Sequence, residues 1–294
     1  GFPTPVDISI SKFNATGTNL IYSTYLGGTG GEAPQSLVTN DNGELYIFGT
    51  TGSNNFPRSI GCYDNTFGGG TNVNPNGSGV NYFTGCDIFV TKINTAGNAI
   101  LGSTFIGGTG NDGINIEPGM AYNYGDEFRG EIILDNLGNC IIASSTNSTN
   151  FPITTGKLAN SGGTSDAVIF KLNSSLTALV WSTHFGGTGA DAAYGLQTDG
   201  LGNVFVTGGT KSTDIDFKTT PYLGRRTISV DQVAEQGITD MPFKPVLVYI
   251  SGKKVDQDLN QVVFDSTINK DGVLYKQRID EINMILQKDV LGYP

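Results

Sequence analysis

The sequence predicts an all-β protein built of four-stranded blades of the β-propeller type, with a small α+β segment at the C-terminus. Two observations carry this prediction: one stretch of sequence recurs three times, and each copy holds four short runs of strand-forming residues. Four antiparallel strands per repeat are typical of propeller blades. Because three blades are recognisable and a closed propeller takes at least about four, we expect an open or incomplete propeller.

The repeat is most visible in the string Ser-Thr-x-x-Gly-Gly-Thr-Gly. It begins at Ser23, Ser103 and Ser182, so the copies lie 103 − 23 = 80 and 182 − 103 = 79 residues apart. Other fixed positions keep the same order in each copy: an Asp and a Lys before the string, and a Gly in a turn after it (Asp7, Lys12, Gly43; Asp87, Lys92, Gly138; Asp166, Lys171, Gly202). This order indicates one structural unit used three times.

The third copy defines the strands most clearly. Runs rich in Val, Ile, Phe and Thr lie at about 166–172, 179–185, 194–199 and 203–209. They are separated by Gly, Asn and Asp, which favour turns because their side chains or their backbone freedom suit tight chain reversals. We therefore expect four short strands in this copy and the same four in the others.

The repeats place the blades at about 7–57, 87–152 and 166–219. A typical blade needs about 40–50 residues, so spacings of 80 and 79 residues indicate insertions, which we place at 58–86 and 111–128. Residues 1–220 thus form the repeat region. Phe2-Pro3 matches the Phe-Pro that closes two copies, which predicts that the chain begins inside a longer array. The alternative is an open arc of blades that is completed by the tail or by another subunit.

Residues 221–294 differ in composition, with few Gly and many more charged residues, and predict an α+β segment. Residues 245–250 form a strand-like run. A helix is expected from about 273 to 291, where apolar residues recur at helical spacing. This apolar stripe is either a packing face within its own domain or a contact with a partner.

The motifs together resemble the SBBP beta-propeller repeat over about residues 1–220. They are Asp-x-Phe-Val-x-Lys-Ile-Asn, Tyr-Ser-Thr-Tyr-Leu-Gly-Gly-Thr-Gly, Asp-x-x-Gly-Asn-Val-x-Val-x-Gly and Asn-Phe-Pro. This family occurs mainly in secreted and surface proteins of bacteria, often beside adhesive or gliding-motility modules. The resemblance implies a propeller and an exported protein, and it supplies no catalytic motif.

The insertions hold the candidate site residues. Cys62 and Cys86 bracket a Gly- and Asn-rich loop, and a disulfide between them would stabilise the fold by about 3 kcal/mol; two unpaired thiols are the alternative. Because loops carry function more often than scaffolds do, we expect ligand contacts at Tyr82, Tyr122 and Tyr124. The alternative is that both loops lie at the rim of the propeller and bind no ligand.

We expect no catalytic residue and no bound metal or cofactor. His184, the one histidine, takes the repeat position of Tyr25 and Phe105, which indicates a strand residue. Glu32, Asp112 and Asp191 share a position after the Gly-rich string. Such repeated acids could ligate Ca²⁺ through oxygen, but they more often fix a turn by accepting backbone N–H groups.

The charge and hydropathy of the chain limit its partners. A net charge of −10 disfavours nucleic acid, and the sequence has no apolar run near the roughly 20 residues that a membrane helix needs. We expect an exported, non-catalytic cell-surface scaffold or adhesion protein that binds a protein or glycan. An alternative is a structural subunit of an extracellular fibre or surface machine, self-assembled through blade edges and the C-terminal helix. A polysaccharide-active enzyme is a third possibility.

Overall fold

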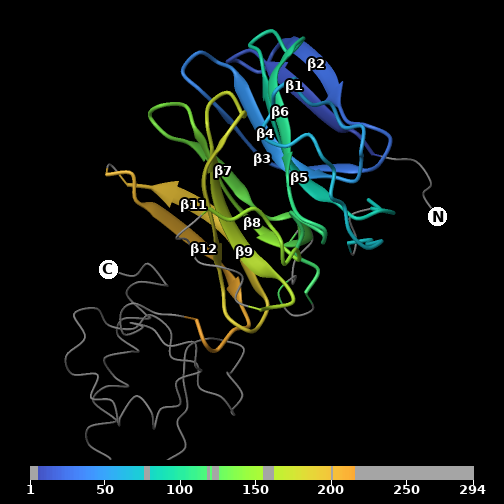
Figure 1. Cartoon of the computed structure of the whole chain (residues 1–294). Coiled ribbons are helices and arrows are strands. Elements are labelled where there is room, and N and C mark those ends of the chain that lie inside the picture. The colour runs from blue at the N-terminus through green and yellow to red at the C-terminus, as the bar shows by residue number, and fades with distance from the viewer. Residues whose placement is uncertain are drawn as a thin grey trace, which may run out of the picture. The chain divides into compact units, whose positions relative to one another are not determined.

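The computed structural model describes residues 6–75, 80–117, 120, 126–154, 162–199 and 201–215. These residues form twelve strands and one short 3₁₀ helix (Figure 1). The elements are β1 (Ile8–Phe13), β2 (Leu20–Leu26), β3 (Glu32–Thr39), β4 (Leu45–Thr51), β5 (Asp87–Ile93), β6 (Ile100–Ile106), η1 (Asp126–Phe128), β7 (Glu131–Leu134), β8 (Cys140–Thr146), β9 (Asp166–Leu172), β10 (Leu179–Phe185), β11 (Asp191–Thr198) and β12 (Val204–Thr210).

The strands form four antiparallel sheets, in which each strand pairs with a strand adjacent to it in the sequence. Two sheets have four strands, in the orders β3-β4-β5-β6 and β7-β8-β9-β10, and two have two strands, β1-β2 and β11-β12. The only helical element in the described part of the chain is η1. The predicted all-β fold with four-stranded blades is therefore confirmed.

The sheets are offset from the sequence repeats by two strands. β3 and β4 end the first copy and β5 and β6 begin the second, yet all four share one sheet. The predicted blade limits at 7–57, 87–152 and 166–219 therefore follow the repeats and not the sheets. The reason is that each Gly-Gly-Thr-Gly string leads from one sheet to the next, as at 27–30 between β2 and β3, instead of joining two strands of one sheet.

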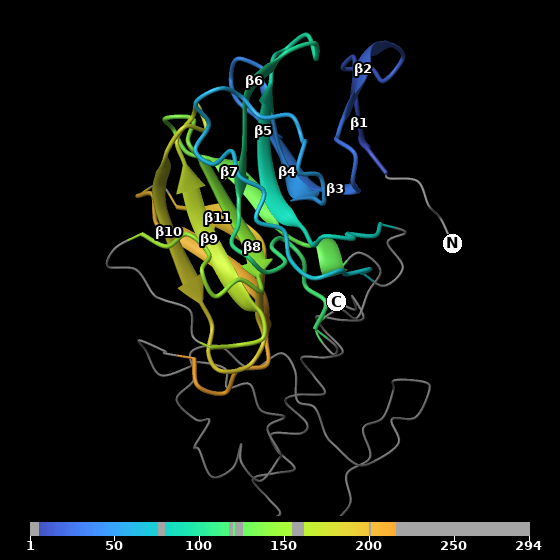
Figure 2. The same ribbon diagram turned by 45° about the vertical axis from the view of Figure 1, so that its right-hand side comes forward.

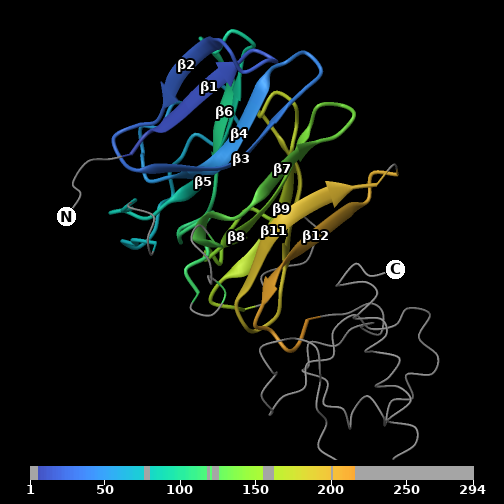
Figure 3. The same ribbon diagram turned by 180° about the vertical axis from the view of Figure 1, so that it is seen from behind.

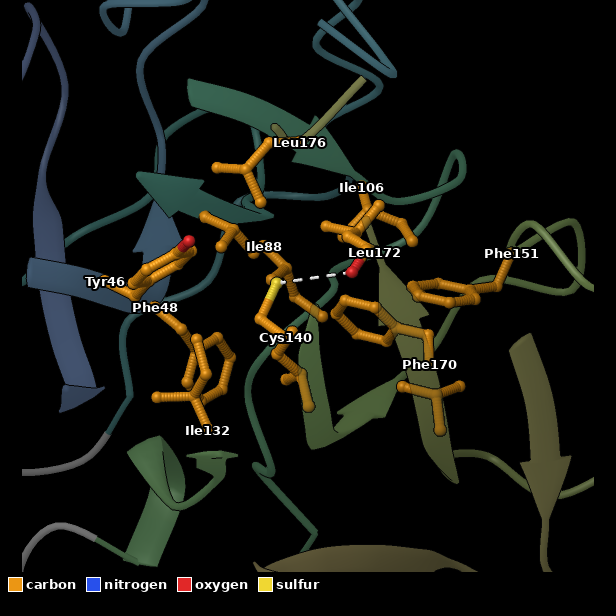
Figure 4. Packing of buried hydrophobic residues seen from close by; sticks show 13 residues of the cluster. Tyr46, Phe48, Ile88, Ile106, Ile132, Cys140, Phe151, Phe170, Leu172 and Leu176 are labelled. Atoms are coloured by element: carbon orange, nitrogen blue, oxygen red, sulfur yellow. Dashed lines mark hydrogen bonds between the residues drawn. The ribbon is translucent and has the colours of Figure 1, made fainter. Parts of the chain in front are cut away.

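The main hydrophobic core lies between the two four-stranded sheets. Figure 4 shows Tyr46 and Phe48 of β4 and Ile88 of β5 facing Cys140 of β8 and Phe170 of β9. All of these side chains are buried. Aromatic and branched side chains from both sheets interdigitate here, which holds the two blades together.

Alternate residues of the central strands face opposite neighbours. On β8, Cys140 and Ile142 belong to the main core, whereas Ile141 and Ala143 pack against Ala193 and other residues of β11. On β4, Leu45 and Ile47 similarly pack with residues of β1. Because successive side chains of a strand point to opposite faces, a strand buried on both faces is apolar throughout. The four sheets are therefore stacked in chain order, with the two-stranded sheets at the ends (Figures 2 and 3).

The C-terminal segment 221–294, with its predicted strand at 245–250 and helix at 273–291, lies outside the described residues. Within the described ranges, no helix is long and apolar enough to cross a membrane.

Candidate binding surface

A buried acidic residue anchors the Gly-rich string of every repeat; the three are Glu32, Asp112 and Asp191. Asp112 Oδ2 accepts the Gly108 N–H at 2.7 Å, and Asp191 Oδ2 accepts the Gly187 N–H at 2.8 Å. The Ser148 hydroxyl, from the chain after β8, donates to Asp112 at 2.8 Å. Each carboxylate thus ties the connection between two sheets to the end of a central strand.

A second carboxylate lies beside the first in the middle repeat. Asp87 accepts the N–H groups of Gly68 at 2.7 Å and Gly69 at 2.9 Å. A Cβ atom on Gly107 would lie 2.8 Å from Asp112 Oδ2 and 2.9 Å from Asp87 Oδ1, so only glycine fits between the two acids. Burial raises the pKa of Asp87 to about 8 and that of Asp112 to about 7.

These contacts confirm the predicted turn-fixing role of the repeated acids. Their oxygen atoms accept hydrogen bonds from glycine N–H groups and Ser hydroxyls in all three copies, and from Thr hydroxyls in the first two. The described residues hold no group of three or more His, Cys, Asp or Glu side chains that could bind a metal. The hydrogen bonds that the carboxylates accept make them part of the scaffold.

The two insertions pack together beside the Gly-rich connection of the middle repeat. Tyr82 and Cys86 of the first insertion form a buried cluster with Ile114 of the second, and the Phe128 ring lies 6.3 Å from the Tyr82 ring. Cys86 O accepts the N–H of Asp112 at 2.8 Å, which joins the two segments through the backbone. The insertions thus form one platform with its own small core.

The expectation that Tyr82 contacts a ligand is wrong. Its side chain is fully buried, and its hydroxyl shares a 2.7 Å hydrogen bond with the Thr50 hydroxyl on β4. Burial raises the pKa of the phenol well above its ordinary value. Tyr82 therefore fastens the insertion to the four-stranded sheet. Tyr122 and Tyr124 lie outside the described residues.

The predicted disulfide between Cys62 and Cys86 is not formed, and both residues are free thiols. Cys86 is enclosed in the platform core beside Ile114, whereas Cys62 lies on the segment whose backbone bonds to β6 through Ser59 and Asp64. The two thiols thus belong to different contacts of the insertion. Burial raises the pKa of Cys86 well above its usual value, which disfavours the reactive thiolate.

The second insertion also reaches the third repeat. Asn115 donates to the Tyr194 hydroxyl on β11 at 2.8 Å, and that hydroxyl donates to the Met120 carbonyl at 3.0 Å. Glu117 forms an ion pair with Lys211, after β12, at 2.6 Å. The platform is therefore supported by two sheets, which gives it a defined geometry.

Two apolar side chains on the platform are exposed, which the sequence did not predict. Phe83 is 69% exposed and follows the buried Tyr82, and Ile116 is 41% exposed and lies two residues after the buried Ile114. The sequence shows an aromatic pair at 82–83 but not which ring faces water. Only the packing of the platform decides that Tyr82 points inward and Phe83 outward.

His184 is a strand residue, as its repeat position predicted. It lies on β10, is 1% exposed, and its ring is 6.1 Å from that of Phe151 in an edge-on arrangement. Burial lowers the pKa of the imidazole. Its Nδ1 atom has no hydrogen-bond partner.

Comparison with known proteins identifies the repeat. A family model described as the SBBP beta-propeller repeat matches residues 180–216. The chain carries an SBBP-type propeller repeat. The matched segment starts in β10, crosses the Gly-Gly-Thr-Gly connection and ends after β12, so the SBBP unit itself spans two sheets. No curated protein matches the chain.

Proposed function

We propose that the protein is an exported, non-catalytic cell-surface scaffold that binds a protein or glycan through the insertion platform. The SBBP repeat supports a surface or binding scaffold. The platform supports the location, because it is fastened to the sheets and exposes Phe83 and Ile116. Exposed aromatic and branched side chains on a rigid support are typical of binding surfaces.

The acidic residues support a non-catalytic role. Asp112 and Asp191, two buried carboxylates of the Gly-rich connections, accept hydrogen bonds from backbone N–H and hydroxyl groups. A glycoside hydrolase needs two carboxylates that reach its substrate. An enzyme is the competing hypothesis, and a panel of polysaccharides incubated with the purified protein tests it.

The binding proposal is tested with a double variant, Phe83→Ser with Ile116→Ser, on a glycan array and on fixed bacterial cells. We expect the variant to bind at least tenfold more weakly, because both apolar contacts are removed. Ile60→Ser is the matched control, since Ile60 is fully exposed on the first insertion but outside the platform core. Unchanged binding by the double variant, or turnover of a polysaccharide by the wild-type protein, would contradict the proposal.

Export is tested separately on intact source cells. If the protein is at the surface, added protease degrades it without lysis. Protection from protease until the cells are opened would contradict a surface location.

A structural subunit of a fibre or surface machine is the second candidate. The observation that favours it is the two-stranded sheet at each end of the stack (Figure 3), because among the described residues these sheets have strand edges without a partner strand.

A further inference from the structure

The two end sheets correspond to the two halves of one blade. By repeat position, β1 and β2 are equivalent to β5 and β6, the last two strands of a complete blade, and β11 and β12 are equivalent to β3 and β4, the first two. In the complete blades the central contact is β4 with β5 and β8 with β9. Among the described residues, β12 and β1 both lack this central partner.

We propose that β12 of one copy pairs with β1 of a second copy, so that two end sheets complete a four-stranded blade. The complete blades define the register. Thr51 lies opposite Asp87 in one, and Thr146 lies opposite Asp166 in the other. The equivalent residues at the ends of the chain are Thr210 and Asp7, which places Val206 opposite Ser11.

The exposure of apolar residues on the end sheets supports this pairing. Phe205 of β12 is 61% exposed, whereas its equivalent on β4, Tyr46, is fully buried. Phe13 of β1 is 58% exposed, whereas its equivalent on β5, Ile93, is 4% exposed. The sequence therefore keeps core residues at positions that are exposed on the end sheets and are buried where complete blades pack against neighbouring sheets.

Charge complementarity gives an independent argument. In the complete blades a lysine crosses the central strand pair to an acid of the opposite turn: Lys92 to Glu44 at 2.7 Å, and Lys171 to Asp135 at 2.6 Å. Lys12 is the equivalent lysine on β1, and its recorded contact is a 3.5 Å hydrogen bond to the Thr95 carbonyl.

The acid equivalent to Asp135 is Asp199, at the turn between β11 and β12. Asp199 accepts the Asn203 amide at 2.7 Å, just as Asp135 accepts the Asn139 amide at 2.9 Å. The proposed contact brings Lys12 of one copy to Asp199 of the next. It thereby repeats the ion pair of the complete blades.

The two edges are complementary, and a second copy brings them together. Within the described residues the two end sheets are separated by both complete blades (Figure 3), so they do not meet within one copy. Because the two edges differ, the contact is head to tail, and repeated contacts give either a closed ring or an open chain of copies. This inference is independent of ligand binding at the platform.

Cysteine cross-linking of the full chain tests both the partner and the register. Ser11→Cys and Val206→Cys in one chain, with Cys62→Ser as background, place two thiols opposite each other in the proposed pair. Mild oxidation is expected to give cross-linked oligomers on a non-reducing gel, a single species for a closed ring and a ladder of dimers, trimers and longer species for an open chain. The matched control, Ser9→Cys with Val206→Cys, shifts one thiol by two residues along β1 and should give much weaker cross-linking.

The cross-linking has two overturning outcomes. A fast-migrating cross-linked monomer would mean that the edges close within one chain. A protein that stays monomeric and uncross-linked at every concentration would mean that another segment of the chain, or nothing, covers the edges.

Charge reversal gives a second measurement, by sedimentation over a concentration series. Lys12→Glu should weaken self-association about fivefold, which corresponds to a partly exposed ion pair. Thr16→Glu adds a negative charge to the exposed turn of the same hairpin and should leave association unchanged. Equal effects of the two variants would contradict the proposed Lys12 contact.

Discussion

At the residue scale, the buried acids make the fold sensitive to pH. Asp87 and Asp112 have folded pKa values of about 8 and about 7, both raised above the ordinary value of 3.8 by burial. The folded state therefore binds more protons than the unfolded state between about pH 4 and pH 8. Their stabilising contribution is complete below pH 4 and is lost as the pH rises through the folded pKa values.

We expect the melting temperature to fall as the pH is raised from 5 to 8. Each group contributes at most about 1.4 kcal/mol per pH unit within its own window. Asp112→Asn removes one titrating group and keeps an acceptor for the Gly108 N–H, so it should flatten the dependence. Calorimetric melting at several pH values measures both effects. A wild-type melting temperature that is constant or rises over this range would contradict the prediction.

His184 provides a second prediction at this scale. Its Nδ1 atom is buried without a hydrogen-bond partner, and the equivalent residue in the second repeat is Phe105. Because an unsatisfied buried polar atom costs about 1–3 kcal/mol, His184→Phe should raise the free energy of unfolding by about 1 kcal/mol. Urea denaturation at pH 7 measures the change, and a lower midpoint would show that the ring nitrogen is needed.

At the element scale, the platform separates a structural aromatic residue from an exposed one. Tyr82→Ala removes a buried ring and its hydrogen bond to Thr50, so it should lower the free energy of unfolding by about 3–5 kcal/mol. Phe83→Ser changes an exposed side chain and should cost under about 0.5 kcal/mol. Denaturant titration compares the two, and equal losses would contradict the assigned orientations.

The strands illustrate what local sequence can predict. The expected strands at 166–172 and 179–185 coincide with β9 and β10, and the expected third and fourth runs overlap β11 and β12. Turn residues and β-branched runs are local signals, so they place strands well. The same signals carry no information on which strands share a sheet. The predicted blade limits are therefore offset from the observed sheets by two strands.

At the scale of the whole molecule, burial decreases from the central blades to the end sheets. Every residue of β4 and β8 is buried, whereas β12 is mostly exposed. We therefore expect hydrogen exchange to be slowest in β4 and β8 and fastest in β2 and β12, because local opening of the ends breaks few apolar contacts. Exchange measured by mass spectrometry in dilute protein tests this order.

Concentration adds a control to that measurement. If copies pair head to tail, protection of β1 and β12 should increase with protein concentration while that of β8 stays constant. Equal protection of β12 and β8 in dilute protein would contradict the gradient of burial.

The sequence by itself determined the strands, the Gly-rich connections and the acids that anchor them, because these depend on neighbouring residues and on a unit that recurs three times. It also placed His184 in a strand. Only the tertiary structure decided how the strands divide into sheets, that Tyr82 points inward, and that Cys62 and Cys86 remain apart. These outcomes depend on contacts between distant segments, where burial of apolar surface outweighs any local preference.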